Sequence, residues 1–168
     1  MPQEPVVDGF EFAEFGKMLR GAWRVADFTR LPEVLHDSAG ELGYAVSGER
    51  DKQGRPALRI ELHGVLRLTC QRCLEPMDFP LAVDTLLTLA RRQSEVDADP
   101  LESDVERVVG SKGMAVRDLL EDELLLAVPV APRHLRCAAG GVASSDGGSP
   151  FEKLRGLLGD ASPDGRKH

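Results

Sequence analysis

The chain has 168 residues, of which 42% are hydrophobic and 29% are charged, a composition that predicts one soluble domain with a substantial apolar core. A net charge of -7 argues against indiscriminate binding to nucleic acid. No apolar run approaches the roughly 20 residues of a membrane helix, and the N-terminus lacks the basic start and apolar centre of a secretion signal. We therefore expect a cytoplasmic protein whose cysteines stay reduced.

Charge is unevenly distributed along the chain. Residues 95–123 hold ten acids and three bases, whereas residues 50–73 hold six bases and two acids. If these segments lie apart in the fold, the molecule has an acidic side and a basic side. The basic side can contact RNA or an acidic protein.

Two helices are predicted near the N-terminus. Within residues 8–20, Phe15, Met18 and Leu19 recur at helical spacing and predict a short amphipathic helix. An extended piece follows at residues 23–25. Thr29 is then placed to cap a second helix that Gly40 ends. The apolar face of this second helix consists of Leu31, Val34 and Leu35.

The middle of the chain is predicted to be β-structure. Residues 42–46 alternate in polarity, residues 48–54 form a turn, and residues 58–70 and 79–89 show the clearest period of two. The last two segments are expected to pair antiparallel through a turn at residues 70–76, with one face buried and the other in water. Gly64 interrupts the apolar side and predicts a bulge or bend.

A loop, a short strand and a third helix are predicted next, at residues 92–104, 105–109 and about 119–128. Asp118 with Glu121 three residues later matches a capping box, and Pro129 ends the helix. The helix dipole favours acids in its first turns, which we expect in solvent. These acids are Glu121, Asp122 and Glu123.

These segments predict an α+β fold: an antiparallel sheet of four to six strands or a partial barrel, with flanking helices and a flexible C-terminal tail. One α+β domain is expected over residues 1–137, a Gly/Ser-rich linker over 138–149 and a helical tail over 150–168. The apolar stripe of that tail either docks on the domain or offers a motif to a partner.

The cysteines give two chemical interpretations. Cys70 and Cys73 form a C-x-x-C pair, and His134 and Cys137 can complete a tetrahedral Zn²⁺ site with three thiolates and one imidazole. Without a metal, these side chains are reduced thiols beside an exposed histidine. A redox dithiol is disfavoured, because the pair follows a strand and not the start of a helix.

Charged side chains give two candidate interaction surfaces. Arg59, Arg67 and Arg72 follow the solvent face of a strand, where they can track a phosphate backbone. No aromatic side chain interleaves with them to stack on bases. Glu121 and Asp122 diverge by about 100° on a helix, so they predict a solvated helix start or a partner surface and not a catalytic pair.

Three motifs resemble those of the YceD family. The sequence Leu68-Thr69-Cys70-Gln71-Arg72-Cys73-Leu74-Glu75-Pro76 is similar to the family's central signature. Residues 121–129, followed by Pro132, His134 and Cys137, resemble its second signature. Pro150-Phe151 with Leu154 and Leu157 is similar to its tail motif, although the glycine-rich insert before the tail departs from the family pattern. The resemblance covers most of residues 25–158.

This resemblance implies a cytoplasmic bacterial protein that supports accumulation of 23S ribosomal RNA in ribosome biogenesis, without catalysis. Its partner is then ribosomal RNA or a protein of RNA metabolism or ribosome assembly, and neither a membrane nor a small-molecule substrate. Either an acidic helix and tail engage a protein, as an adaptor would, or the Arg59 and Arg67 face binds precursor RNA. A nuclease is the weaker third hypothesis, because the four histidines are scattered along the sequence.

Overall fold

The computed structural model describes residues 5–98 and 106–137. The chain forms two units, Met1–Leu135 and Arg136–His168, and every helix and strand below belongs to the first. The expected linker and tail, residues 138–149 and 150–168, lie outside the described residues.

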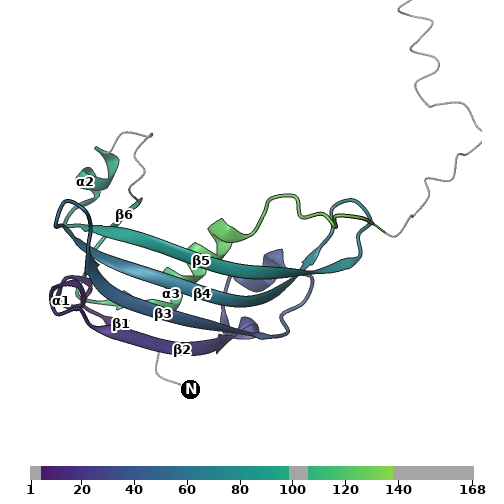
Figure 1. The fold of residues 1–168 in the computed structure, drawn as a ribbon, viewed down its shortest axis with the longest axis horizontal. Coiled ribbons are helices and arrows are strands. Elements are labelled where there is room, and N and C mark those ends of the chain that lie inside the picture. The colour runs from purple at the N-terminus through teal and green to yellow at the C-terminus, as the bar shows by residue number, and fades with distance from the viewer. Residues whose placement is uncertain (1–4, 99–105, 138–168) are drawn as a thin grey trace, which may run out of the picture. The chain divides into compact units, whose positions relative to one another are not determined.

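The first unit is built on a five-stranded sheet in the order β2-β3-β4-β5-β6 (Figure 1). Its strands are β2 Met18–Arg24, β3 Glu41–Arg50, β4 Pro56–Thr69, β5 Pro76–Ala90 and β6 Glu106–Val109. Neighbouring strands are antiparallel except β5 and β6, which run parallel. A second, two-stranded sheet pairs β1 Val6–Val7 with β7 Met114–Ala115. The predicted α+β class is confirmed, with an open and partly mixed sheet in place of a barrel.

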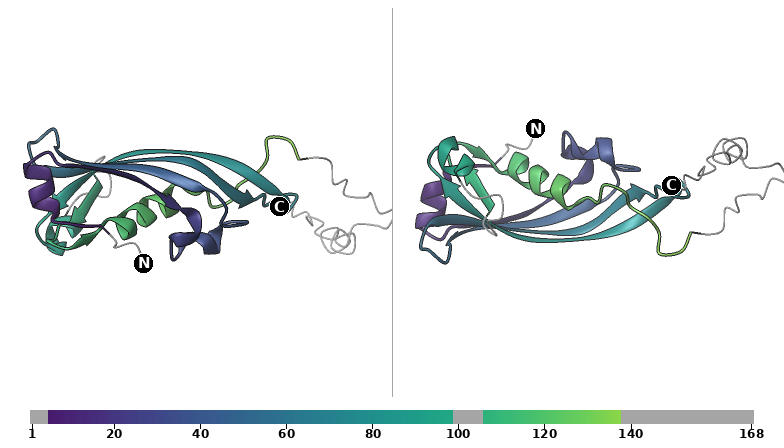
Figure 2. Two further views of the ribbon diagram at one scale, coloured as in Figure 1. Left: turned by 90° about the horizontal axis from the view of Figure 1, so that it is seen from below. Right: turned by 90° about the horizontal axis from the view of Figure 1, so that it is seen from above.

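Helical segments cover one face of the sheet. The α-helices are α1 Gly9–Glu14, α2 Gln93–Asp97 and α3 Val116–Ala127, and the 3₁₀ helices are η1 Val25–Asp27 and η2 Leu31–Val34. Both views of Figure 2 place α3 and the segment containing η1 and η2 on the same side of the sheet. The opposite face of strands β2 to β5 is turned to solvent.

The long β4–β5 hairpin forms as its alternating sequence predicts. The two strands pair continuously from Ala57↔Thr88 to Thr69↔Pro76. One row of β4 side chains is fully buried, and Leu120 and Leu124 of α3 are buried with it. That row consists of Leu58, Ile60, Leu62, Leu66 and Leu68, and Cys70 directly after the strand is buried too.

Gly64 does not form the predicted bulge. The pairing of β4 with β5 runs through it without interruption, as Gly64↔Leu81. A Cβ atom at this position would lie 2.5 Å from Cδ2 of Leu42. Glycine is required here because β3 approaches closely, and the β3–β4 ladder ends at Gly43↔His63, directly before Gly64.

The N-terminal helix is shorter than predicted, because the chain turns at Gly16 into a strand. Helix α1 has six residues, and the Asp8 carboxylate caps it by accepting from the backbone N–H groups of Phe10 and Glu11. Gly16 has a φ of 56°, which favours glycine and helps the chain to turn. Met18 therefore lies in β2, where it pairs with Ser47 of β3.

The second predicted helix is replaced by two 3₁₀ turns, and Thr29 caps neither of them. The carboxylate of Glu121 instead accepts from the backbone N–H groups of Arg30 and Leu31 at the start of η2. The predicted capping box at Asp118 is also wrong, because α3 begins at Val116 and its N-cap makes no side-chain bond. Part of the predicted acidic loop forms the short helix α2.

Candidate metal centre

Cys70 and Cys73 occupy the tight turn between β4 and β5. The N–H of Cys70 donates to the carbonyl of Glu75 at 3.0 Å, and the N–H of Leu74 donates to the carbonyl of Cys70 at 2.9 Å. Leu74 adopts a φ of 63°, which closes the turn directly after the second cysteine. The hairpin thereby brings both thiols to one end of the sheet.

The segment after α3 returns to this turn and delivers His134. The N–H of Gln71 donates to the carbonyl of Pro132 at 2.8 Å, which ties this segment to the turn. The N–H of His134 donates to Sγ of Cys70 at 3.5 Å, and Nδ1 of His134 lies 3.3 Å from Sγ of Cys73. Two segments about sixty residues apart in the sequence therefore meet at the cysteines.

Cys70, Cys73, His134 and Cys137 come together as a candidate metal site. Their ligand atoms all lie within 4.8 Å of one another. A tetrahedral zinc ion has Zn–S and Zn–N distances of about 2.3 and 2.0 Å, so its ligand atoms are separated by roughly 3.3–3.8 Å. Small side-chain movements are enough to bring the observed ligand atoms to the separations of a tetrahedral zinc site. Soft thiolates with an imidazole are the donors that zinc prefers, so the residues present fit the ion.

The ring of His134 is oriented for ligation. Its Nε2 lies 3.2 Å from the carbonyl oxygen of Pro76, which can only accept a hydrogen bond. In the neutral ring Nε2 therefore carries the proton, and the lone pair of Nδ1 is directed toward the sulfur of Cys73. A backbone carbonyl that fixes the tautomer in this way is a common outer partner of metal-bound histidine.

The thiol of Cys70 is held in a form that suits a metal ligand. Its burial raises the pKa, but backbone N–H groups of Cys73, His134 and Arg72 donate to the sulfur and lower the pKa to about 5. The thiolate is the form that binds metal. The turn therefore stabilises a charged sulfur inside a buried site.

Comparison with known families identifies the chain. A family model described as "Large ribosomal RNA subunit accumulation protein YceD" matches residues 58–158. The chain belongs to the YceD family. No curated protein and no solved structure matches it. The family's description concerns the accumulation of large-subunit ribosomal RNA, and the matched segment contains all four residues of the candidate metal site.

In this YceD-family protein, Glu121 is a buried structural group. Its side chain is 2% exposed, and its carboxylate accepts from the N–H groups of Arg30 at 2.6 Å and Leu31 at 2.9 Å. Burial raises its pKa, but these two N–H groups and the Arg30 guanidinium lower it below 4.5 overall. The prediction that the acids of this helix lie in solvent is thus wrong for Glu121 and for Glu123, which are both buried.

Asp122 is the exposed neighbour of buried Glu121. Its Oδ1 lies 2.6 Å from the Arg30 guanidinium, while its side chain remains 58% exposed. One arginine therefore links Glu121 in the interior to Asp122 at the surface. The sequence gives no signal for this triad, because Arg30 lies about ninety residues from both acids.

The predicted basic stripe of the YceD-family chain is matched by acids. Arg59 pairs with Asp84 at 2.6 Å and Glu49 at 3.9 Å. Arg67 lies 3.6 Å from both Asp37 and Asp78. These acids come from neighbouring strands and from the segment after η2, so the alternation of β4 alone could not reveal them.

The whole solvent face of strands β2 to β5 has a mixed charge. The alternation and pairing of these strands place five acids and four arginines on this face. The acids are Glu41, Glu49, Glu61, Asp78 and Asp84, and the arginines are Arg20, Arg24, Arg59 and Arg67. Arg72 lies apart at the β4–β5 turn, where it is exposed and its guanidinium is 3.5 Å from the carbonyl of His134. In the part of the chain that the structure describes, no helix is both long and apolar enough to cross a membrane.

Proposed function

We propose that this YceD-family protein supports accumulation of 23S ribosomal RNA in the cytoplasm as a non-enzymatic adaptor with a structural Zn²⁺ ion. Cys70, Cys73, His134 and Cys137 would hold the ion and occupy all four of its positions. Zinc with four protein ligands has no open position for a substrate and acts as a crosslink. It would fasten the segment after α3 to the β4–β5 turn.

The observation that carries the zinc proposal is the hydrogen bonding of His134. Its Nε2 faces the carbonyl of Pro76 while its Nδ1 faces the sulfur of Cys73. A histidine that merely filled space would not need one ring nitrogen fixed by a carbonyl and the other directed at a cysteine sulfur. The lowered pKa of Cys70 supports the same role.

The charges of the sheet favour an adaptor over direct RNA binding. Arg59 and Arg67 each lie within 4 Å of two carboxylates. RNA phosphates on this face would have to displace these carboxylates and would also meet Glu61 and Glu41. The alternative is a zinc-binding module that contacts precursor ribosomal RNA through Arg72 at the exposed turn.

A gel shift with precursor 23S fragments at low and high salt separates these two functions. We expect no salt-dependent shift, because an adaptor reaches RNA through a protein. In cells, we expect Arg59→Gln with Arg67→Gln to leave 23S accumulation normal, whereas Cys73→Ser lowers it. Direct RNA binding would instead give a shift that weakens steeply with salt and that Arg72→Gln or the double variant reduces.

A further inference from the structure

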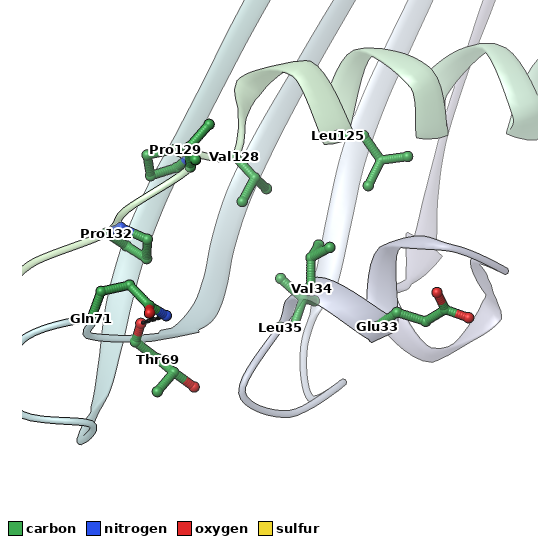
Figure 3. Close-up of a pocket in the computed structure, with 10 residues that line it drawn as sticks. Glu33, Val34, Leu35, Thr69, Gln71, Leu125, Val128, Pro129 and Pro132 are labelled. Carbon is green, nitrogen blue, oxygen red and sulfur yellow. Dashed lines mark hydrogen bonds between the residues drawn. The ribbon is translucent and has the colours of Figure 1, made fainter.

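A hollow and an open sheet edge are two surfaces that the proposed function does not use. The hollow has a volume of about 470 Å³ and lies between η2 and the end of α3, where Leu125 is across from Val34 (Figure 3). Its surroundings carry both charges, since Glu33 is in the lining and exposed Arg72 and Arg133 adjoin it. These charges select no class of ligand, whereas the sequence of the sheet edge does.

Strand β2 forms one edge of the five-stranded sheet (Figure 1). It pairs with β3 without interruption from Met18↔Ser47 to Arg24↔Glu41. Sheet edges in natural proteins are commonly protected from further pairing by proline, lysine or a bulge. The seven residues of β2 include no proline and no lysine, and its unbroken ladder contains no bulge. This edge therefore lacks three of the common barriers to another strand.

The backbone of β2 directs hydrogen-bonding groups toward the open edge. Just before the strand, the N–H of Gly48 donates to the carbonyl of Lys17 at 2.8 Å. Hydrogen-bonded and non-hydrogen-bonded pairs alternate in an antiparallel ladder, so the odd-numbered residues of β2 direct their N–H and C=O groups toward β3. The N–H and C=O groups of Arg20 and Ala22 therefore point away from β3, and both residues are exposed. A further strand could pair with them.

Two apolar side chains of β2 are incompletely covered at this edge. Leu19 and Trp23 are half-buried and pack against the core of their own chain. Gly21 lies between them, and a Cβ atom there would come within 2.8 Å of Oη of Tyr44, so the tyrosine ring occupies the space over the glycine. A second strand beside β2 would cover the remaining exposed parts of Leu19 and Trp23.

The sequence of β2 is complementary to itself in one antiparallel register. A two-fold axis at Gly21 pairs all seven residues of the strand with those of another copy. Leu19 of each copy then lies opposite Trp23 of the other, which forms two apolar pairs on the core face. On the solvent face, Arg20 of each copy lies opposite Ala22 of the other.

The arginines of β2 disfavour the neighbouring registers. A shift by two residues in either direction places Arg20 of one copy directly opposite Arg20 or Arg24 of the other, and like charges in that position are destabilising. A shift by one residue turns the apolar face of one strand to the solvent face of the other. In the register centred on Gly21, arginines meet only on diagonals of roughly 7–8 Å, and Arg24 is already paired with Asp27 at 2.8 Å.

We propose that β2 pairs antiparallel with β2 of a second copy of this chain, about a two-fold axis at Gly21. The pairing joins the two five-stranded sheets into one continuous sheet. It uses the backbone groups of Arg20 and Ala22 that point away from β3, and it covers Leu19 and Trp23. The proposal goes beyond the adaptor function and does not depend on the metal centre.

Sedimentation velocity and amide hydrogen exchange of the full-length protein test this proposal together. We expect a particle of two chains that dissociates on dilution. The amides of Arg20 and Ala22 should be protected in the dimer and should exchange freely in the monomer, whereas the amide of Gly21, which faces β3, is protected in both. A protein that stays monomeric at every concentration measured would overturn the proposal, as would a dimer in which the amides of Arg20 and Ala22 exchange freely.

A pair of charge variants at one exposed position tests the register. Ala22→Glu places a carboxylate opposite Arg20 on both sides of the axis and should lower the dissociation constant of the dimer by roughly 2- to 30-fold. Ala22→Arg places like charges there and should raise the dissociation constant by a similar factor.

Ala82 is the matched control for these variants. It is an exposed alanine on β5 that β3 and β4 separate from β2, and the same two substitutions there should leave the dissociation constant unchanged. If Glu and Arg at position 22 shift the dissociation constant in the same direction, or if position 82 responds as strongly as position 22, the proposed pairing is wrong.

Discussion

At the scale of single residues, the backbone of Leu74 marks the turn that contains the candidate metal ligands Cys70 and Cys73. Leu74 has a φ of 63°, a positive value that residues other than glycine rarely adopt, and its side chain is 71% exposed. This conformation costs an L-residue other than glycine about 1–2 kcal/mol. The turn tolerates this cost because both thiols of the candidate metal site depend on it.

Leu74→Gly should therefore not destabilise the protein. Glycine relieves the left-handed strain, but it also gains about 0.4–1 kcal/mol of freedom in the unfolded chain. We expect the free energy of unfolding in urea to stay the same or to rise by up to about 1 kcal/mol, with metal content unchanged. Leu135→Gly is the control, since Leu135 is fully exposed and has no positive φ, and it should gain nothing. A clear loss of stability in Leu74→Gly would contradict the assigned strain.

At the scale of elements, helix α3 carries two buried acids with opposite surroundings. Glu121 accepts hydrogen bonds from two backbone N–H groups and pairs with Arg30. The pKa of Glu123 is raised above 4.5, first by burial and then by the neighbouring carboxylate of Glu106, although the Thr85 hydroxyl opposes this. Hydrogen bonds and an ion pair thus stabilise the carboxylate of Glu121, whereas burial and a neighbouring acid destabilise the carboxylate of Glu123.

These surroundings predict opposite effects for the same substitution. Glu121→Gln should lower the free energy of unfolding at pH 7 by about 1–3 kcal/mol, since it removes a charged acceptor from buried donors. Glu123→Gln should raise it, since it removes a buried charge that lies beside another acid. Denaturation curves of the two variants, measured side by side, check the signs. If the two variants change the free energy of unfolding equally, the surroundings of Glu121 and Glu123 do not have the opposite effects assigned to them.

The pH dependence of these variants has a defined sign. The folded pKa of Glu121 lies below 4.5, so its stabilisation is present at neutral pH and is lost as the pH falls from 4.5 through the folded pKa. The folded pKa of Glu123 lies above 4.5, so its contribution is present below 4.5 and is lost as the pH rises through the folded pKa. Both differences from wild type should therefore shrink in acid.

The sequence predicted elements well where one side of a strand is buried throughout. The alternation of β4 and β5 fixed their pairing, their turn and their inner face, because a period of two leaves no other face to bury. The helix predicted within residues 8–20 was wrong in its second half, because Phe15, Met18 and Leu19 match helical spacing although the chain leaves α1 at Phe15 and enters β2 at Met18. Only the pairing of Met18 with Ser47 and the turn at Gly16 show where the helix ends and the strand begins.

The candidate site was predictable to the extent that its chemistry is local. Spacing in the sequence was enough to propose Cys70, Cys73, His134 and Cys137, because few residue types bind zinc. The role of Glu121 was not predictable, because its donors lie in η2 and no spacing rule connects that segment with α3. For the same reason the acids that pair with Arg59 and Arg67 appeared only in three dimensions.

At the scale of the whole molecule, the candidate metal centre lies where the β4–β5 turn meets the segment after α3. The β4–β5 turn contacts the segment after α3 through Gln71, Arg72 and the cysteines. A Zn²⁺ ion at this place would fix the end of the hairpin to the segment after α3. Binding to the folded state alone stabilises that state.

The central claim is that this cluster is a closed zinc site, and native mass spectrometry of the purified full-length protein tests it most directly. We expect one zinc ion per chain, retained in His63→Gln and lost in His134→Gln and Cys73→Ser. His63 is the matched control, because it is an exposed histidine on the solvent face of the sheet. Removal of the ion with a chelator should lower the melting temperature of the wild type and leave that of Cys73→Ser unchanged. Wild-type protein that carries no zinc, or a His134→Gln variant that keeps it, would contradict the account.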